Sequence, residues 1–406
     1  MTERSERPRL MLATETYWPE IGGGERQSRC LASGLAALGR EVTILTRRSR
    51  PGLPRREMDG PAAVLRLPPA GRGRWRKWLT LIPACLALCI RRRQYDAVLV
   101  SGFRILGIAA LAARAVTGRP TILKADSRGE LSGDYFRAGL ADAGLTPESA
   151  GVSLALRVRN VLLRRADAFV AISDELASEF LENGVPPSRI RRIPNGVDTE
   201  VFRPASAEER SVLRRKLGLP SAPVAVYTGR LVSYKGLPSL LRAWRNVPSA
   251  CLVLVGEGGG DLHACEQELR EFVAAEGLQA RVRFAGPVER VDDWLRAADL
   301  YVFPTEDEAF GLALVEAMAC GLPCVTTRIG GLRDFVVDEV NAVAVPTRDE
   351  VALAAACGSL LASEGRRATL GAAARRTAVE RFGLAAVVGA YASLLDELAA
   401  ATRAAA

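Results

Sequence analysis

Histidine is almost absent from this sequence of 406 residues, which contains His263 alone, and none of its eight cysteines forms a C-x-x-C pair. Because protein zinc sites are built mainly from Cys and His at short spacings, no metal site is expected. Most of the cysteines lie among Ala, Leu and Val, which is typical of buried free thiols in a reducing cytoplasm. The charged first residues, MTERSERPRL, do not resemble a signal peptide.

Long apolar runs are also missing. The uncharged run Trp78–Ile90 has 13 residues, whereas a membrane-spanning helix needs about 20. Apolar residues make up 49% of the chain and charged residues 25%, the balance of a soluble globular protein rather than of a disordered or fibrous one. We therefore expect a cytoplasmic protein of two or three domains that does not span a membrane.

Charge is unevenly distributed along the chain. Residues 1–203 carry 33 basic and 21 acidic side chains, a net charge of +12, and the rest carries 22 and 25, a net charge of −3. A basic half joined to a mildly acidic half predicts that the first half meets an anionic ligand or surface. No nucleic-acid-binding module is recognisable in the sequence, so nucleic acid is not the expected partner.

Short apolar, β-branched runs alternate with helical patterns along nearly the whole chain. Continuous apolar strands separated by helices indicate parallel sheets that are covered on both faces. Two series of six strands therefore predict an α/β protein of two Rossmann-like, doubly wound domains. The expected strands lie within residues 9–15, 41–46, 62–68, 96–100, 120–125 and 167–173, and then within 222–230, 250–258, 281–286, 299–304, 323–327 and 341–346.

Turn signals in Ile193–Pro204 mark the expected joint between the two domains. We therefore predict an N-terminal domain over residues 1–203 and a C-terminal domain over residues 204–382. The last residues, 383–406, are expected to form a helix that packs back on the N-terminal domain.

The most specific segment contains two glutamates eight residues apart, Glu308 and Glu316. Every residue of Ala309–Thr327 except Glu316 is uncharged, and a carboxylate inside an apolar helix is costly unless something pairs with it. If the helix starts near Phe310, the two carboxylates lie roughly 12 Å apart on either side of its free amides. A ligand with hydroxyls at both ends of a diphosphate, such as a nucleotide-sugar, fits this pattern. The alternative is a buried ion pair between Glu316 and an arginine.

E-x7-E followed by A-M-A-C-G-x-P resembles the signature of the retaining glycosyltransferases of family 4, which have the GT-B fold. The resemblance extends over most of the chain, through the segments AISD, PNGVD, TGRLVSYKG, VGEG and ADLYVFP in the same order. It implies two Rossmann-like domains that face a cleft, with the nucleotide-sugar donor on the C-terminal domain and the acceptor mainly on the N-terminal one.

The resemblance also implies roles for individual residues. Glu316 would bind the ribose hydroxyls, and Glu308 would bind the donor sugar together with the residues that follow it, Ala309, Phe310, Gly311 and Leu312. Family members usually carry glycine at the position of Ala309. Its amide can serve the same purpose only if the loop needs no glycine conformation there.

Cations and glycines supply the expected diphosphate site. Arg230 and Lys235 lie in a strand-to-helix loop, where they can hold a diphosphate and stabilise its growing charge as the glycosidic bond breaks. Gly22, Gly23 and Gly24 follow the first strand, and their amides can approach a ligand closely at a helix N-terminus. By the resemblance, Gly23 and Gly24 contact the donor phosphate or sugar. They do not form a G-x-G-x-x-G fingerprint, which disfavours a dehydrogenase.

One family feature is missing. Many members carry a histidine after the fifth strand of the N-terminal domain, near the reacting sugar, where this chain has Lys124–Glu130 without one. Asp126 is taken as the catalytic candidate there, and Arg128 and Glu130 as candidates that contact the acceptor or sugar. His263 is expected to be a surface or capping residue rather than a catalytic one.

The segment Arg74-Trp75-Arg76-Lys77-Trp78 precedes an apolar run that Arg91-Arg92-Arg93 closes. Tryptophans interleaved with cations beside an apolar stretch are typical of interfacial segments, so this region is a candidate contact with an anionic membrane surface. An ordinary core helix with solvated charged ends explains the pattern equally well.

These observations predict a metal-independent, cofactor-free retaining glycosyltransferase. It would transfer a sugar from a nucleotide diphosphate donor to a lipid-linked or otherwise anionic acceptor in cell-envelope polysaccharide or glycolipid synthesis, at the inner face of the membrane. The alternatives are another GT-B enzyme, such as a nucleotide-sugar epimerase or a phosphorylase, or a nucleotide-sugar-binding protein without catalysis.

Overall fold

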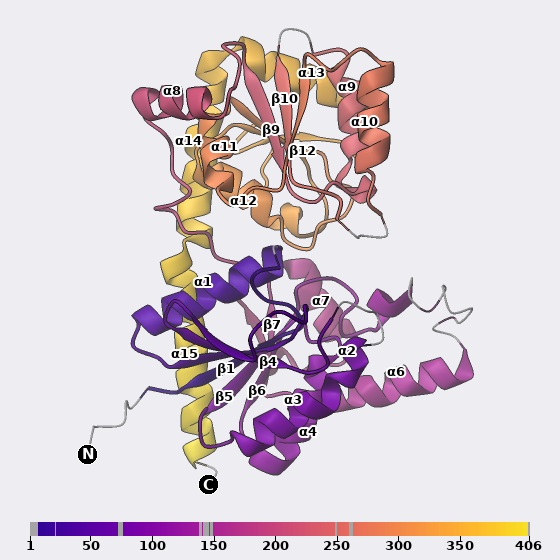
Figure 1. Cartoon of the computed structure of the whole chain (residues 1–406), viewed down its shortest axis with the longest axis vertical. Coiled ribbons are helices and arrows are strands. Elements are labelled where there is room, and N and C mark those ends of the chain that lie inside the picture. Colours follow the sequence, from indigo (N-terminus) through magenta and orange to yellow (C-terminus); the bar gives the residue numbers. More distant parts are fainter. Residues whose placement is uncertain are drawn as a thin grey trace. The chain divides into compact units, whose positions relative to one another are not determined.

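The computed structural model describes residues 7–20, 22–71, 76–137, 140, 146, 149–247, 250–259 and 263–404. The chain divides into two compact units (Figure 1). Unit 1 comprises Met1–Gly196 together with Leu384–Ala406, and unit 2 comprises Val197–Gly383. The division falls before the boundary expected after residue 203, because Val197 already bridges Gly383 in parallel and donates to the carbonyl of Phe382.

Unit 1 is built on a sheet whose described strands follow the order β3-β4-β2-β1-β5-β6-β7-β8. Its core strands are completely buried, so they read as continuous apolar runs in the sequence. The short β3 pairs antiparallel with β4, and the other neighbouring pairs are parallel. The strands are β1 Leu10–Thr14, β2 Val42–Arg47, β3 Arg56–Asp59, β4 Ala62–Leu67, β5 Ala97–Ser101, β6 Thr121–Lys124, β7 Ala168–Ala171 and β8 Ile190–Arg192.

Helices cover this sheet in two groups. The first helix and the C-terminal helix contact each other and share a core with the apolar side chains of β1, β5 and β7. A second group is formed by α3, α4 and α6, in which α4 contacts both of the others. The described helices are α1 Gly23–Ala37, α2 Arg76–Leu79, α3 Leu81–Ile90, α4 Leu106–Thr117, α6 Ala150–Leu163, α7 Asp174–Glu182 and α15 Leu384–Ala404, with the 3-10 turns η1 Asp134–Phe136 and η2 Pro187–Arg189.

Unit 2 is built on a parallel sheet with the order β11-β10-β9-β12-β13-β14. This order places the end of β9 beside the end of β12, so the loops that follow these strands are neighbours. The strands are β9 Val224–Thr228, β10 Cys251–Val255, β11 Val282–Gly286, β12 Leu300–Phe303, β13 Cys324–Thr327 and β14 Val343–Val345.

The helices of unit 2 pack on both sides of this sheet (Figure 1). Helix α9 contacts α10 and α13, and α12 contacts α14. The described helices are α8 Ala207–Lys216, α9 Leu237–Trp244, α10 Glu266–Ala275, α11 Val291–Ala297, α12 Leu312–Ala319, α13 Glu350–Ala362 and α14 Glu364–Phe382, with the 3-10 turns η3 Ser233–Lys235 and η4 Gly330–Asp334.

All twelve expected strands are present, and the expected class of two parallel-sheet α/β domains is confirmed. Among the described strands, two were not predicted. Strand β3, with the sequence REMD, alternates exposed and half-buried positions at a sheet edge, and β8 has only three residues, two of which are arginines. Neither has the apolar run that predicts a strand.

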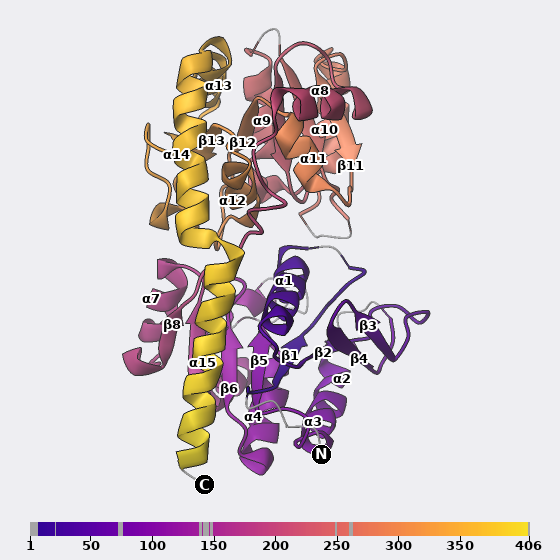
Figure 2. The same ribbon diagram turned by 90° about the vertical axis from the view of Figure 1, so that its left-hand side faces the viewer.

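Helix α15 is long and apolar enough to cross a membrane by length and composition alone. Several of its apolar side chains, including Val388, Leu394 and Leu395, instead lie in the core of unit 1. Helix α15 runs beside α1 in unit 1 (Figure 2). The contact with α1 is close at Gly34, where an added Cβ would lie 2.4 Å from Cγ2 of Val388. The helix therefore packs against α1 across a glycine.

We predict that Gly34→Ala lowers the free energy of unfolding by about 1–3 kcal/mol, because the new methyl overpacks the rigid Val388 side chain. The matched control is Gly389→Ala on α15, where an added Cβ meets no atom within 4 Å. This control should raise stability by about 0.5–1 kcal/mol through helix propensity. Urea unfolding of both variants measures the difference, and equal gains would mean that α15 does not pack on α1.

Candidate donor site

The loop after β9 presents two cations around one tyrosine. Arg230 is exposed, and its Nη2 donates to the hydroxyl of Tyr234 over 2.6 Å. Lys235 closes the 3-10 turn η3, and Gly236 follows in the left-handed region with φ 70°. A Cβ on Gly236 would lie 1.9 Å from the carbonyl oxygen of Pro304, so only glycine lets this turn approach the end of β12.

The loop after β12 brings Glu308 to Lys235. The Nζ of Lys235 lies 2.8 Å from Oε2 of Glu308 and donates over 3.0 Å to the carbonyl of Asp307. The two side chains are only 13% and 17% exposed, so the charges are partly desolvated. The structure thus joins two predicted donor-binding residues that are 73 positions apart in the sequence.

The helix that carries Glu316 begins at Leu312, two residues after the expected start near Phe310. The delay has a backbone cause: Gly311 is the N-cap, with φ 94°, and an added Cβ would clash with Leu332. The amide of Phe310 donates to Oε1 of Glu308 over 3.3 Å, so this carboxylate is fixed close to the helix N-terminus.

Ala309 takes an ordinary backbone conformation. Among the described residues, only Glu339 and Arg348 have positive φ without being glycine. The position that is usually glycine in the family therefore needs no left-handed backbone in this chain, and alanine presents its amide there without strain.

Glu316 lies in the middle of α12 and is 4% exposed. Its apolar neighbours on the helix are completely buried. Its negative charge helps to raise the pKa of the nearby Cys320 thiol, although burial is the larger cause. A carboxylate in such surroundings is an acceptor of directed hydrogen bonds.

Chemically, unit 2 places one carboxylate and two cations on adjacent loops beside the amino end of α12, and a second carboxylate inside this helix. The cations and the helix dipole attract an anion such as a diphosphate, and the carboxylates accept hydrogen bonds from hydroxyls.

In unit 1, the glycine loop meets the predicted Asp126. Gly22 caps α1 with extended backbone, and Gly23 and Gly24 form its first turn. A Cβ on Gly24 would lie 3.6 Å from Oδ2 of Asp126. Asp126 accepts a hydrogen bond of 2.8 Å from Ser101 and forms an ion pair with the buried Lys124. The structure therefore brings the glycine loop and the catalytic candidate of this unit together.

The expectation that Glu130 contacts the acceptor or sugar is wrong, because its side chain is fully buried. Its Oε1 accepts hydrogen bonds from the amides of Asp126 and Ser127, each over 3.1 Å, so it orders the Asp126 loop from beneath. Burial raises the pKa of Glu130 to about 7, against the opposing charge of Arg104. Its Oε2 has no hydrogen-bond partner.

Two further residues that the sequence did not single out complete this support. Glu179 of α7 accepts hydrogen bonds from the amides of Gly129, Leu131 and Ser132. The largely buried Arg159 donates to the carbonyls of Glu130 and Leu131. A buried carboxylate and a buried guanidinium thus fix the loop that follows Asp126, whereas sequence alone gives no sign of their partners.

The remaining candidates have varied surroundings. Arg128 is 70% exposed and pairs with Glu175 on α7 over 3.1 Å. Arg74 and Trp75 lie outside the described residues, and Arg76 and Lys77 begin α2. Trp78 is exposed, with its ring 5.8 Å from that of Phe136.

His263 is exposed, as expected, but its ring packs edge-on against Tyr234, with centroids 5.7 Å apart. Sequence reasoning did not single out Tyr234. The available signal was its position between Arg230 and Lys235.

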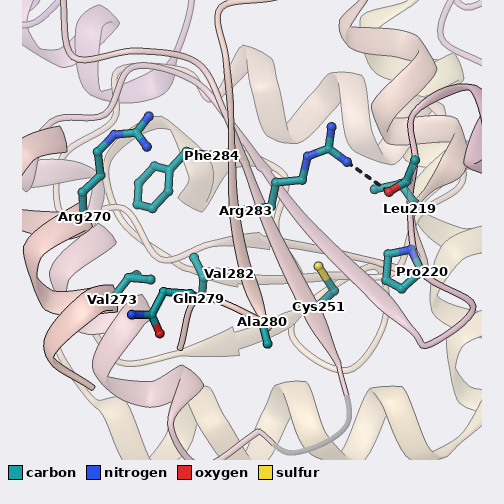
Figure 3. Close-up of a pocket in the computed structure, with 11 residues that line it drawn as sticks. Leu219, Pro220, Cys251, Arg270, Val273, Gln279, Ala280, Val282, Arg283 and Phe284 are labelled. Atoms are coloured by element: carbon teal, nitrogen blue, oxygen red, sulfur yellow. Dashed lines mark hydrogen bonds between the residues drawn. The ribbon is translucent and has the colours of Figure 1, made fainter. Parts of the chain in front are cut away.

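A cavity of about 630 Å³ lies elsewhere in unit 2 (Figure 3). Its walls include Cys251 and Val282, the first residues of β10 and β11, and Arg270, whose guanidinium lies 4.3 Å from the ring centroid of Phe284. The donor candidates follow the carboxyl ends of the strands instead, where open parallel sheets bind ligands. The cavity is lined by none of the predicted site residues.

Two family models match the chain. Glycosyl transferase 4-like domain matches residues 22–196, and Glycosyl transferases group 1 matches residues 222–363. Together they cover most of the chain, with one model in each unit. The chain belongs to the group 1 glycosyltransferases, as its motifs predicted.

Curated relatives include the D-inositol 3-phosphate glycosyltransferase of Xylanimonas cellulosilytica, 39% identical over 59% of this chain and 58% of the relative. Another is D-inositol 3-phosphate glycosyltransferase 1 of Catenulispora acidiphila, 32% identical over 64% of this chain and 65% of the relative. The chain thus spans less than two thirds of the length of the curated relatives that it matches.

Solved structures with the same fold cover nearly the whole chain. Sucrose-phosphate synthase from Thermosynechococcus elongatus is 25% identical with a TM-score of 0.82, over 97% of this chain and all of that one. Anabaena HepE in complex with UDP and glucose is 22% identical with a TM-score of 0.77, over 96% of this chain and all of that one. These likenesses confirm the GT-B class.

The raised pKa of Glu130 predicts a pH-dependent stability. Between about pH 4.5 and pH 7 the native state keeps a proton on Glu130 that the unfolded chain has released. The Glu130 contribution therefore falls as pH rises through this range. In Glu130→Gln this fall should vanish, so the variant gains stability relative to wild type as pH rises from 4.5 to 7.

Urea unfolding at several pH values measures this effect. The exposed Glu271→Gln is the control, and its stability should run parallel to that of wild type. If the Glu130→Gln and wild-type curves also run parallel, Glu130 does not titrate in this range.

Proposed function

We propose that this protein is a retaining glycosyltransferase that moves a sugar from a nucleotide diphosphate donor to the hydroxyl of an anionic acceptor. The observation that carries the proposal is the arrangement around the start of α12. Glu308 lies at its N-terminus, bonded to Lys235 from the neighbouring loop, and Glu316 is buried one turn further on.

The donor would bind both to the carboxylates and to the cations and helix amides. In this proposal Glu316 accepts hydrogen bonds from the ribose hydroxyls, and Glu308 accepts them from the donor sugar. Arg230, Lys235 and the first amides of α12 hold the diphosphate. Charge-assisted hydrogen bonds of this type contribute about 1.5–3 kcal/mol each.

The mechanism that we propose is front-face substitution, in which the acceptor hydroxyl attacks from the side of the leaving diphosphate. It needs little further chemistry from the protein. The leaving diphosphate takes the proton of the attacking hydroxyl, while Arg230 and Lys235 stabilise the negative charge that grows on it. In unit 1 we assign Asp126 to the reacting sugar, since it takes the place of the usual family histidine. The proposal requires neither a cofactor nor a metal ion.

Two comparisons narrow the substrates to test. HepE was solved with UDP and with UDP-glucose, so a uridine diphosphate sugar is the first donor that we propose. The curated relatives are named for D-inositol 3-phosphate, an anionic polyol, and the basic first half of this chain suits an acceptor of that charge. A lipid-linked anionic acceptor fits the same charge.

Unit 1 also supports the proposed contact with a membrane. Helix α3 exposes Ile82, Leu86 and Ile90 at spacings of four residues, which places them in one stripe. Helix α6 exposes Leu154, Val158 and Val161 in a second stripe. Exposed cations lie beside both stripes, at Arg92, Arg93, Arg157 and Arg165. Apolar stripes edged with cations suit an anionic lipid surface, so we propose that these stripes contact one.

The donor site is tested by thermal unfolding with UDP, GDP and ADP. One of them should stabilise the wild type by about 2.7 kcal/mol at a hundredfold excess over its dissociation constant. Glu316→Ala should lose most of this response, because the ribose loses its acceptor. Glu271→Ala, on the exposed side of α10, should keep it.

If none of the three nucleotides binds, the donor-site assignment is wrong. If one binds and its nucleotide-sugar is converted into a different nucleotide-sugar without an acceptor, the protein is an epimerase. If transfer requires inorganic phosphate as acceptor, it is a phosphorylase. Binding without turnover over a panel of acceptors would identify a protein that binds nucleotide-sugars without catalysis.

The membrane surface is tested by sedimentation with phosphatidylglycerol vesicles. Wild type should bind them, and binding should weaken with added salt because screening shortens the reach of the cations. Ile82→Asp with Leu86→Asp should abolish binding, since a carboxylate cannot enter the lipid interface cheaply. The control is Val351→Asp, an equally exposed apolar position on α13 of unit 2. Loss of binding in the control alone, or none in the α3 variant, would contradict this surface.

A further inference from the structure

Tyr234 occupies the centre of the donor loops. Its hydroxyl accepts the hydrogen bond from Arg230, and its ring centroid lies 5.8 Å from the guanidinium carbon of Arg230 and 5.2 Å from Nζ of Lys235. Its own carbonyl accepts the amide of Glu306 over 2.8 Å. One residue therefore contacts both candidate diphosphate ligands and the loop after β12.

His263 supports the tyrosine from the loop after β10. The two rings are nearly perpendicular, at 82°, with the edge-to-face geometry that aromatic pairs favour. The backbone of the same loop is fixed as well: the amide of Ser233 donates to the carbonyl of His263, and Val232 bridges Ala264. The only histidine of the chain is thus part of the wall behind Tyr234.

This arrangement lowers the entropy that the exposed Arg230 side chain would lose on binding an anion. A free Arg side chain loses much rotamer entropy when it binds an anion, and a hydrogen bond that fixes it beforehand lowers that loss. The ring face also attracts both cations, which offsets their mutual repulsion when no anion is bound. Tyr234 can therefore hold the two cations ready while Lys235 keeps its ion pair with Glu308.

We propose that Tyr234 is a positioning residue for the diphosphate of the donor, acting through Arg230 and Lys235, and that His263 supports its ring. This rests on the proposed function, because it assumes that a nucleoside diphosphate binds at these loops. Its hydroxyl acts on Arg230, and its ring acts on both cations, so the two actions can be separated by substitution.

Tyr234→Phe removes the hydroxyl and keeps the ring. In calorimetric titrations it should weaken the binding of the nucleoside diphosphate that stabilises the wild type by up to about tenfold, the effect of having to immobilise one side chain that is no longer fixed beforehand. Binding of the corresponding monophosphate should change little, because it lacks the second phosphate. A variant that merely damaged the loop would weaken the binding of both ligands.

A double-mutant cycle tests the route of the effect. In the Arg230→Ala background, Tyr234→Phe should cause no further loss, whereas in the Lys235→Ala background it should cause nearly its full loss. Tyr234→Leu, which also removes the ring, should weaken binding more than Tyr234→Phe. If Tyr234→Phe weakens binding equally in both backgrounds, Tyr234 does not act through Arg230.

His263→Ala should weaken diphosphate binding less than Tyr234→Phe, and His263→Phe should restore it, since an aromatic edge again packs on Tyr234. Failure of His263→Phe to restore binding would remove His263 from the proposal. If wild type binds no nucleotide at all, the proposed function fails. If wild type binds one and Tyr234→Phe binds it equally well, only this inference fails.

Discussion

The ion pair between Lys235 and Glu308 is the interaction on which the candidate donor site depends. It joins the loops after β9 and β12, which start from neighbouring strands of one parallel sheet. Because both side chains are largely buried, water solvates their charges poorly, so each fixes the position of the other. Glu308 in turn accepts the amide of Phe310, two residues before α12 begins. The cation, the carboxylate and the helix amides are therefore positioned together.

Close backbone contacts also join the segment after β12 to the turns η3 and η4, and glycine makes these contacts possible. An added Cβ would lie 1.9 Å from the carbonyl oxygen of Pro304 at Gly236 and 2.2 Å from that of Ala309 at Gly331. Such contacts leave no room for a side chain, so the loops close on one another without intervening atoms. The ion pair and the backbone contacts reinforce each other, because each brings the chain close enough for the other to form.

Local pattern was sufficient for the twelve apolar strands and for the residues that lie in motifs, because burial on both faces leaves a continuous apolar run. Local pattern failed where the surroundings of a residue depend on a partner that is distant in the sequence. Glu130 has the sequence context of an exposed polar loop, yet it is buried beneath the amides of Asp126 and Ser127. Tyr234 was missed because its partners Arg230 and His263 meet it only in three dimensions. The start of α12 was misplaced because Gly311 caps it with positive φ.

The buried support under Asp126 fixes the residue that we propose in place of the usual family histidine. Ser101 and Lys124 each bond one oxygen of the Asp126 carboxylate, and the Glu130 side chain fixes its amide from below. Each carboxylate oxygen has two lone pairs, so both can still accept a hydrogen bond from a sugar hydroxyl. The side chain is 20% exposed, enough for such a contact. A charged acceptor held rigidly by three neighbours can thus orient a hydroxyl at this position, whereas it supplies no proton as an imidazolium would.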